Sequence, residues 1–367
     1  MSTIALIAGG GSKGDRLFDP ATSRDNVLER FRLLREALSA EGHVCRTADM
    51  LDPSVIDVLI FHDVLNELDA VLRIVKANPQ VRLIYVANEP SFVAPLHDHQ
   101  SLARLPVDCV LTWNDLVAGK VPHVVKCNIG QPIIHAENIP CLSFAGKKLI
   151  CAIFANKPSL GENLLFVERV RAVEFFAQQP LGMDLYGIGW ENTGSDILES
   201  AYRGKCASKR EVLQGYRFSL AYENVKGLPG LITEKIFDCF DAGTVPIYLG
   251  APNIEDYIPK ACFVDAKQFD DYAQLYAFLA NMPEAEYQRY LDAAKSFITS
   301  AAYQAFTSST YVSIMVAQIK MLTSQHVAPK SVQAIKLRLL GLVIAGVGSL
   351  QNWKLFKRFF YTVATVW

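Results

Sequence analysis

The sequence predicts an α/β protein with two domains of comparable size that face each other, followed by a helical, basic tail. Apolar runs of four to eight residues alternate with longer segments of helical period, which is typical of parallel α/β sheets. A stretch rich in Pro, Asn and Gly over 122–148 interrupts the alternation, which then resumes. The chain has 367 residues, enough for two domains at roughly 150 residues each.

The first domain is expected over 1–148. The apolar run 3–8 predicts its first strand, and the segment 26–40 places Phe31 and Leu34 on one face of a helix. Further strands are predicted over 43–46, 58–61, 82–87 and 109–112.

The second domain is expected over 149–325. Thr233 is a favourable N-cap for a helix over 233–241, and Gly243 follows the end of that helix. The other elements predicted here are strands over 149–155, 183–186, 218–222 and 245–249, helices over 163–178 and 209–216, and about three helices between 270 and 322. Two such domains imply a cleft between them, where α/β folds bind ligands.

Composition excludes several classes of protein. Hydrophobic residues make up 51% of the chain and charged residues 20%, which excludes disordered, collagen-like and disulfide-dense proteins. The eight cysteines contain no CxxC pair, so we expect reduced, buried thiols rather than a zinc or redox site. The chain starts with a short apolar stretch that no positive region precedes, so we expect neither a signal peptide nor a membrane span there, and a cytoplasmic protein.

The charge of the chain is unevenly distributed. Its net charge is −1, yet eight Lys and Arg and no acidic residue follow Asp292, which argues against a uniformly basic nucleic-acid binder. In the tail, expected over 326–367, the segment 353–361 interleaves cations with aromatic residues, as in helices that lie on anionic membranes. The alternative is a last helix docked on the body with its charges solvated.

One strand-loop-helix segment is the strongest candidate for a ligand-binding site. A strand ends in Tyr222-Glu223-Asn224, a loop with Gly and Pro follows, and Thr233-Glu234-Lys235 begins a helix. A helix N-terminus offers free N–H donors and partial positive charge, so with Lys235 it suits a diphosphate. The same residues are equally compatible with an ordinary helix start, in which Glu234 favours the dipole and Lys235 is solvated.

Two weaker motifs favour ordinary structure. The Gly-rich turn over 9–14 has the spacing of neither phosphate-binding motif, GxxxxGK(S/T) or GxGxxG, so a tight turn is the simpler interpretation. Because GxGxxG is the motif that binds dinucleotides, its absence also disfavours a dinucleotide oxidoreductase. His97-Asp98-His99 are three adjacent residues, which rarely converge on a metal and could instead line an acceptor side.

The segment 216–263 resembles the donor-binding signature of the α-1,3/4-fucosyltransferases, glycosyltransferase family 10. It contains YEN, then TEK, then AGTVPIYLG, then NIEDYIP, in the order and approximate spacing of that family. Two segments resemble the family more loosely, namely Asn88-Glu89-Pro90 and CAIFANK at 151–157. The resemblance covers roughly residues 80–280.

This resemblance implies a GT-B fold of two facing Rossmann-like domains, and transfer of L-fucose from GDP-fucose, with inversion, to a hydroxyl of a glycan or lipid-linked acceptor. Glu89 matches the family's general base, and Glu234 the acid that contacts fucose. Lys235 matches the lysine on the diphosphate, and Asn224 matches the asparagine that follows the family's F-E pair on the donor side. No cofactor is implied, and no metal is expected, because the sequence lacks a D-x-D at a strand end and cationic side chains could replace Mg²⁺.

The remaining donor-side residues are Thr233, at the helix start, and an arginine in the helix after CAIFANK. Arg171 and Arg169 both fit by position, and we prefer Arg171. Leu231 stands where the family usually has tyrosine, so a transferase that uses another sugar nucleotide is an alternative. A third possibility is a non-catalytic protein that binds nucleotide sugars or membranes.

Overall fold

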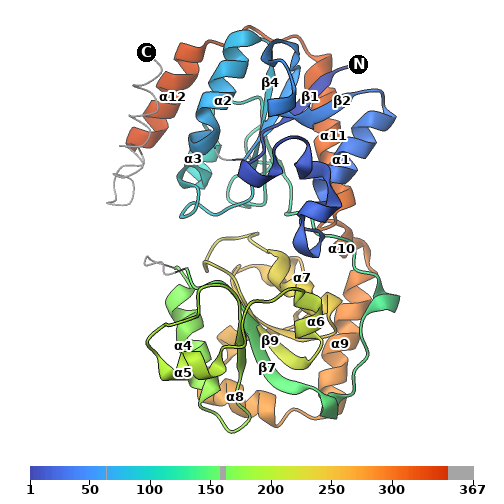
Figure 1. Ribbon diagram of the computed structural model, residues 1–367, viewed down its shortest axis with the longest axis vertical. Helices are drawn as coiled ribbons and strands as arrows, with labels where there is room; N and C mark the ends of the chain where they lie inside the picture. The colour runs from blue at the N-terminus through green and yellow to red at the C-terminus, as the bar shows by residue number, and fades with distance from the viewer. Residues whose placement is uncertain (63, 158–162, 346–367) are drawn as a thin grey trace. The chain divides into compact units, whose positions relative to one another are not determined.

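The structure is a computed structural model that describes residues 1–62, 64–157 and 163–345 (Figure 1). The chain forms two compact units. Unit 1 combines Met1–Gly130 with the chain from Ser308 onward, and unit 2 is Gln131–Thr307. The expected boundary at 148 is therefore too late, because the irregular segment that follows residue 130 packs with the second sheet.

Unit 1 is built on a six-stranded parallel sheet in the order β2-β1-β3-β4-β5-β6. The strands are β1 (Thr3–Leu6), β2 (Val44–Thr47), β3 (Val58–Phe61), β4 (Arg82–Ala87), β5 (Cys109–Thr112) and β6 (Val124–Lys126). All six residues of β4 are buried, as expected for a central strand covered on both faces. Strand β6 falls within the stretch that we expected to be irregular.

Helices cover both faces of this sheet. On one face, α1 (Glu29–Ala40) and α11 (Ser308–Ser324) pack on alternate strand residues such as Ile4 and Ile60. On the other, α2 (Val64–Ala77), α3 (His99–Leu102) and α12 (Val332–Ala345) pack on residues such as Leu59. This alternation is the two-residue period of a buried strand.

Unit 2 has a five-stranded parallel sheet in the order β11-β10-β9-β7-β8. The strands are β7 (Lys148–Ile153), β8 (Asp184–Tyr186), β9 (Tyr216–Tyr222), β10 (Val245–Leu249) and β11 (Val264–Asp265). The helices are α4 (Phe166–Ala177), α5 (Asp196–Ala201), α6 (Lys209–Leu213), α7 (Glu234–Asp241), α8 (Tyr272–Ala280), α9 (Glu284–Ile298) and α10 (Ala301–Gln304). Helices α4 and α8 cover one face and α7 covers the other, whereas α9 contributes side chains to the cores on both faces.

The segment 308–325 was expected in the second domain, but it returns to unit 1 as α11. Its buried side chains Tyr311, Met315 and Ile319 share a core with α1, which is what holds it there. Between residues 270 and 324 the structure has four helices, α8 to α11, where we predicted about three.

Helix α12, the start of the expected tail, docks on unit 1. Ile335, Leu339 and Leu342 are buried in the core that contains α2. Over this part of the tail the docked alternative therefore holds, whereas the segment 353–361 lies outside the described residues. Among the described helices, none combines the length and apolar character required to cross a bilayer.

All eight cysteines are free thiols, as predicted, and seven are buried. Cys141 is exposed, contrary to the expectation of burial.

Candidate active site

A cluster of charged side chains in unit 2 lies just beyond the carboxyl end of β9. Strand β9 is the middle strand, hydrogen-bonded to β7 and to β10, and it runs directly into Glu223 and Asn224. Helix α7 then begins at Glu234. In parallel α/β sheets the carboxyl ends of the strands form the edge that binds ligands, so the sequence places these residues where ligand chemistry is expected.

Glu223 is the buried carboxylate of this cluster. Its side chain has no exposed surface, and its carboxylate accepts hydrogen bonds from the backbone N–H of Thr233 (2.9 Å) and from the Thr233 hydroxyl (2.8 Å). A Cβ on Gly250 would lie 2.5 Å from the Glu223 Cγ, so only glycine fits beside this carboxylate. Sequence reasoning did not single out Glu223 as a site residue.

Thr233 occupies the N-cap position of α7, but its side chain does not cap the helix. Its hydroxyl donates to Glu223 and accepts from the Lys235 Nζ at 2.9 Å. The first N–H groups of α7 are therefore not capped by this side chain.

Lys235 is held between two carboxylates. Its Nζ lies 3.2 Å from Glu223 and 3.5 Å from Glu234, and 17% of its side chain is exposed. Burial lowers the pKa of Lys235, but both carboxylates outweigh it and raise the pKa above its ordinary value. Lys235 is therefore a permanent cation at the N-terminus of α7.

Glu234 is the more exposed carboxylate, with 36% of its side chain accessible. It lies 3.5 Å from the Lys235 Nζ and 3.9 Å from the Nζ of Lys209, a residue that we did not single out from the sequence. Burial raises the pKa of Glu234, but these two ammonium groups outweigh it and lower the pKa to about 2. Glu234 is thus ionised at neutral pH and suits charge stabilisation rather than proton donation.

Arg169, on α4, connects the cluster to β9. One Nη donates to the backbone oxygen of Tyr222 (2.5 Å) and to the Oδ1 of Asn224 (2.9 Å). The side chain is buried, and its Nε has no hydrogen-bond partner among the described residues. Burial lowers the pKa of Arg169 to about 10, which leaves it a cation at neutral pH.

Arg171, the arginine we preferred, does not lie in this cluster. Its side chain is 69% exposed, and its charged partner is Glu168 on the same helix, at 3.8 Å. Residues two apart on a helix point to nearly opposite sides, so only one arginine of this pair can face β9. Helix α4 begins at Phe166 and turns Arg169 toward the sheet.

Glu89 belongs to unit 1, in the loop that follows β4. Its side chain is exposed, whereas its backbone is held in place. The Nδ1 of His97 lies 2.5 Å from the Glu89 carbonyl oxygen, and the indole of Trp113 donates to the Asn88 carbonyl at 2.8 Å. A carbonyl can only accept, so His97 donates through Nδ1 and its Nε2 accepts from the Tyr85 hydroxyl. His97 is thus a structural residue.

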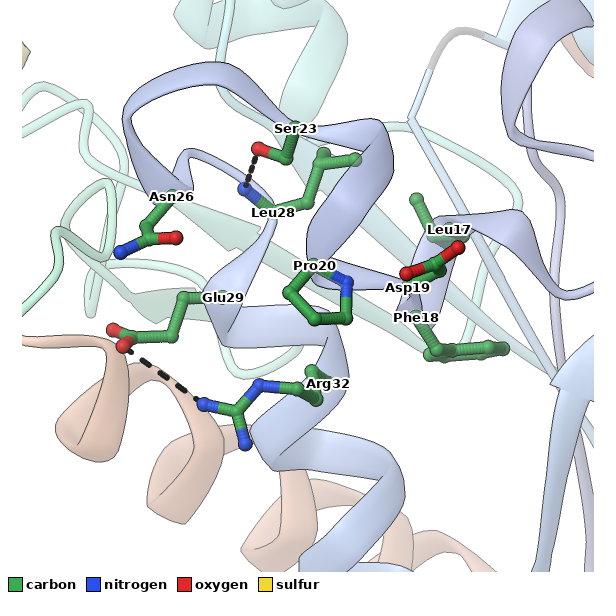
Figure 2. A pocket seen from close by; sticks show the side chains of 9 residues that line it. All are labelled: Leu17, Phe18, Asp19, Pro20, Ser23, Asn26, Leu28, Glu29 and Arg32. Atoms are coloured by element: carbon green, nitrogen blue, oxygen red, sulfur yellow. Dashed lines mark hydrogen bonds and ion pairs between the residues drawn. The ribbon is translucent and has the colours of Figure 1, made fainter.

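A pocket of about 320 Å³ lies in the long loop of unit 1 between β1 and α1 (Figure 2). Four short 3-10 turns shape this loop, and Asp15, Asp25 and Asn26 adopt positive φ angles of 63°, 54° and 55°. Hydrogen bonds fix it, among them the Leu28 N–H to the Ser23 hydroxyl (3.1 Å). The pocket is lined by Leu17, Phe18, Asp19, Pro20, Ser23, Asn26, Leu28, Glu29 and Arg32.

Glu89 and this pocket lie on the same edge of the unit 1 sheet. Strands β1 and β4 are parallel and are separated by β3, so their carboxyl ends are roughly 10 Å apart at ordinary strand spacing. Unit 1 therefore presents a carboxylate and a polar pocket together at the edge where α/β sheets bind ligands.

Among the described residues, no group of three or more His, Cys, Asp and Glu side chains is arranged to hold a metal ion. Within the motif His97-Asp98-His99, Asp98 instead caps α3 by accepting from the N–H groups of Gln100 and Ser101.

Two units with parallel sheets, one of them carrying a cationic cluster at a helix N-terminus, are characteristic of the GT-B class of glycosyltransferases. A solved α1,3-fucosyltransferase structure matches with a TM-score of 0.54 at 14% identity, over 90% of this chain and 92% of that one. The structure of HepE from Anabaena with UDP-glucose matches with a TM-score of 0.55 at 10% identity, over 88% of this chain and all of that one. At these identities the matches establish the fold.

The sequence comparisons identify the family. Residues 146–337 match the family described as glycosyltransferase family 10 (fucosyltransferase), C-terminal part, and the chain belongs to this family. An α-(1,3)-fucosyltransferase of Helicobacter pylori is 39% identical over 83 residues, which is 22% of this chain and 17% of that protein. An α-(1,4)-fucosyltransferase of Arabidopsis thaliana is 37% identical over 67 residues, which is 18% of this chain and 16% of that protein. The matched segments thus span about a sixth of these relatives.

Proposed function

We propose that this protein transfers L-fucose from GDP-fucose to a hydroxyl group of a glycan or lipid-linked acceptor, with inversion at the anomeric carbon. The observation that carries the proposal is the arrangement of Lys235, Glu234 and Arg169 around the N-terminus of α7. It supplies what a sugar diphosphate needs, namely fixed cations next to a carboxylate, beyond the end of a central strand.

The diphosphate of the donor is the group that the cations would bind. As the bond from the sugar to phosphate breaks, negative charge develops on the leaving diphosphate, and Lys235 and Arg169 are permanent cations that offset it. The N-terminus of α7 adds N–H donors to the same site. Because these groups supply the charge, we propose that the reaction needs no divalent metal.

Family membership and one further structural match support GDP-fucose as the donor. A solved structure of an α1,3-fucosyltransferase with GDP-fucose has the same fold, with a TM-score of 0.51 and 14% identity. Leu231 is nearly fully buried next to α7 and provides no hydroxyl to the donor side, so GDP-mannose is the competing donor to be tested.

The two carboxylates take different roles in the proposed displacement. Glu89, exposed beyond β4, accepts the proton of the acceptor hydroxyl as the hydroxyl oxygen bonds to the anomeric carbon. On the opposite side of that carbon the bond to the phosphate oxygen breaks and GDP leaves, which inverts the configuration. Glu234 is ionised and stabilises the positive charge that develops on the sugar.

The acceptor would bind in unit 1. The pocket beside α1 combines hydrogen-bonding side chains (Asn26, Glu29 and Arg32) with an apolar wall that includes Phe18, a mixture that suits sugar hydroxyls and ring faces (Figure 2). Its loop is tied by internal hydrogen bonds, so the pocket is formed in the absence of a ligand.

The test is product analysis with purified protein. GDP-fucose is offered with N-acetyllactosamine and lipid-linked oligosaccharides, and the anomeric configuration of any product is read by NMR. An α-linked fucoside that disappears in Glu89→Gln supports the proposal. A β-linked product argues against inversion, since the fucose of GDP-fucose is β-linked, and full activity in Glu89→Gln rules out Glu89 as the base.

We also propose that the protein works at the cytoplasmic face of the membrane, in peripheral contact with anionic lipid. The support is compositional, since Lys354, Lys357 and Arg358 alternate with aromatic residues in the tail. Co-sedimentation of the full chain with anionic vesicles tests this, and equal binding of a variant that carries Gln at these three positions would contradict it.

A further inference from the structure

A second pocket of unit 1, of about 680 Å³, lies at the opposite edge of the sheet from Glu89. Asp108 and His123 line one wall of this pocket, and because they directly precede β5 and β6, both stand at the amino ends of their strands. The other wall of the pocket is formed by residues of the segment 327–338, which includes the start of α12. The six-residue strand β4 separates the two edges by roughly 20 Å.

The pocket carries an excess of positive charge. Arg104, Lys330 and Arg338 line it, against the single carboxylate of Asp108. Asp108 is already shared, since it accepts from the Leu83 N–H at 2.7 Å and lies 3.0 Å from the Lys330 Nζ. Helix α12 offers no compensating acid, because no Asp or Glu follows Asp292 in the sequence.

Both arginines are exposed and available. Within the described ranges, neither the Arg104 nor the Arg338 guanidinium takes part in a hydrogen bond or an ion pair. A guanidinium presents a planar fork of N–H donors that matches the oxygens of a phosphate group.

Two further polar groups of the pocket are buried and lack a hydrogen-bond partner among the described residues. They are the Nε2 of His123 and the Nζ of Lys330, whose approach to Asp108 forms an ion pair without hydrogen-bond geometry. Buried polar atoms in folded proteins nearly always have a partner, so these two nitrogens are suited to donate to the oxygens of an anion that enters the pocket.

We propose that this pocket binds the phosphate group of an anionic ligand, either a soluble phosphate ester or a phospholipid headgroup. Phosphate provides several acceptor oxygens around one centre, which can satisfy Arg104 and Arg338 from outside and Lys330 and His123 from within. Ser331, just before the first residue of α12, adds a hydroxyl at the same place. The site is separate from the proposed donor site and does not depend on the proposed function.

The test compares two double variants that remove the same charge. Arg104→Gln with Arg338→Gln alters the pocket, whereas Arg73→Gln with Lys76→Gln removes two exposed cations of α2 that do not line it. All four side chains are exposed, so both variants should fold, and thermal unfolding checks this. Inorganic phosphate binding is measured by calorimetry, and because both variants keep Lys235, any phosphate bound there contributes equally to the two titrations.

The expected result is a loss of phosphate affinity of at least about tenfold in the pocket variant and less than about twofold in the α2 variant. Crystals soaked in tungstate, a phosphate-like anion with strong anomalous scattering, should show the ion between Arg104 and Arg338. Equal affinities in wild type and pocket variant, or an equal loss in both variants, would overturn the proposal.

A vesicle experiment identifies the source of the phosphate. If the ligand is a lipid headgroup, the pocket variant binds vesicles of phosphatidylcholine and phosphatidic acid more weakly than the α2 variant does, and inorganic phosphate competes. If the ligand is soluble, both variants bind vesicles equally and only the calorimetric difference remains. Absence of both differences overturns the proposal.

Discussion

Glu223 and Lys235 form an ion pair of 3.2 Å in which the glutamate side chain is completely buried and 17% of the lysine side chain is exposed. The pair joins the end of β9 to the start of α7, and the backbone N–H of Thr233 is bound by the same carboxylate. Glu223 thus positions Lys235, and only Lys235 is accessible to a ligand.

Replacing Glu223 should therefore affect stability and donor binding together. Glu223→Ala leaves the buried end of the pair empty and is expected to lower the free energy of unfolding by about 3–5 kcal/mol. Glu223→Gln keeps the shape and should cost about 1–3 kcal/mol, because one acceptor oxygen is lost. Denaturant unfolding measures both, and GDP titration of the folded Gln variant should show weaker binding. Unchanged GDP affinity in Glu223→Gln would show that Lys235 does not need this anchor.

The two arginines of α4 provide a matched comparison. Arg169→Lys removes the hydrogen bonds to Tyr222 and Asn224 and should reduce kcat/KM for the donor about 100-fold. Arg171→Lys changes an exposed side chain and should leave kcat/KM within about twofold. Steady-state kinetics with varied GDP-fucose measures kcat/KM for both variants. A larger loss in Arg171→Lys than in Arg169→Lys would identify Arg171 as the arginine that binds the donor.

The depressed pKa of Glu234 predicts a specific dependence of stability on pH. Burial opposes ionisation, but Lys235 and Lys209 hold the pKa near 2, below the ordinary value of 4.5. The ionised form therefore stabilises the folded state above about pH 4.5, and this contribution decreases as the pH falls toward 2. The stability difference between wild type and Glu234→Gln should be constant at neutral pH and should shrink in that acid window. A difference that changes between pH 6 and 8 would contradict the shift, as judged by urea unfolding across pH.

The acceptor pocket is tested with two glutamates, one at each end of α1. Glu29 lines the pocket, whereas Glu41, which follows the last residue of α1 and pairs with Lys320 at 2.7 Å, does not. Glu29→Gln is expected to raise the KM for the acceptor several-fold with the donor KM unchanged, because a hydrogen bond to a sugar hydroxyl is weakened. Glu41→Gln should leave both KM values as in wild type. Equal effects of the two substitutions would place the acceptor elsewhere.

The order of strands and helices was largely predictable from the sequence. Each buried strand is a short apolar run, and each helix repeats its apolar residues with the helical period. Strand β4 and helix α7 start and end within one residue of their predicted positions. The boundary was not predictable in this way, because the segment after residue 130 has no periodicity and its place depends on long-range packing with unit 2. The return of α11 to unit 1 depends likewise on a core shared with α1, more than 250 residues earlier in the chain.

The site was predicted by motif more than by geometry. Thr233, Glu234, Lys235 and Asn224 lie together as expected, since one strand-loop-helix segment carries them. Arg169 and Lys209 come from other helices, so their place depends on how α4 and α6 pack, and a spacing argument could not choose between Arg169 and Arg171. Glu223 was overlooked because an acid between a strand and a loop has no distinguishing pattern until its burial is known.

The most direct test of the account is a donor competition assay. Purified protein is given equal amounts of GDP-fucose and GDP-mannose with a panel of glycan acceptors, and products are identified by mass spectrometry. We predict that a deoxyhexose is transferred in preference to a hexose, and that this product is lost in Lys235→Ala but retained in Arg171→Lys. Transfer of mannose in preference to fucose, or undiminished fucose transfer in Lys235→Ala, would contradict the proposed donor site.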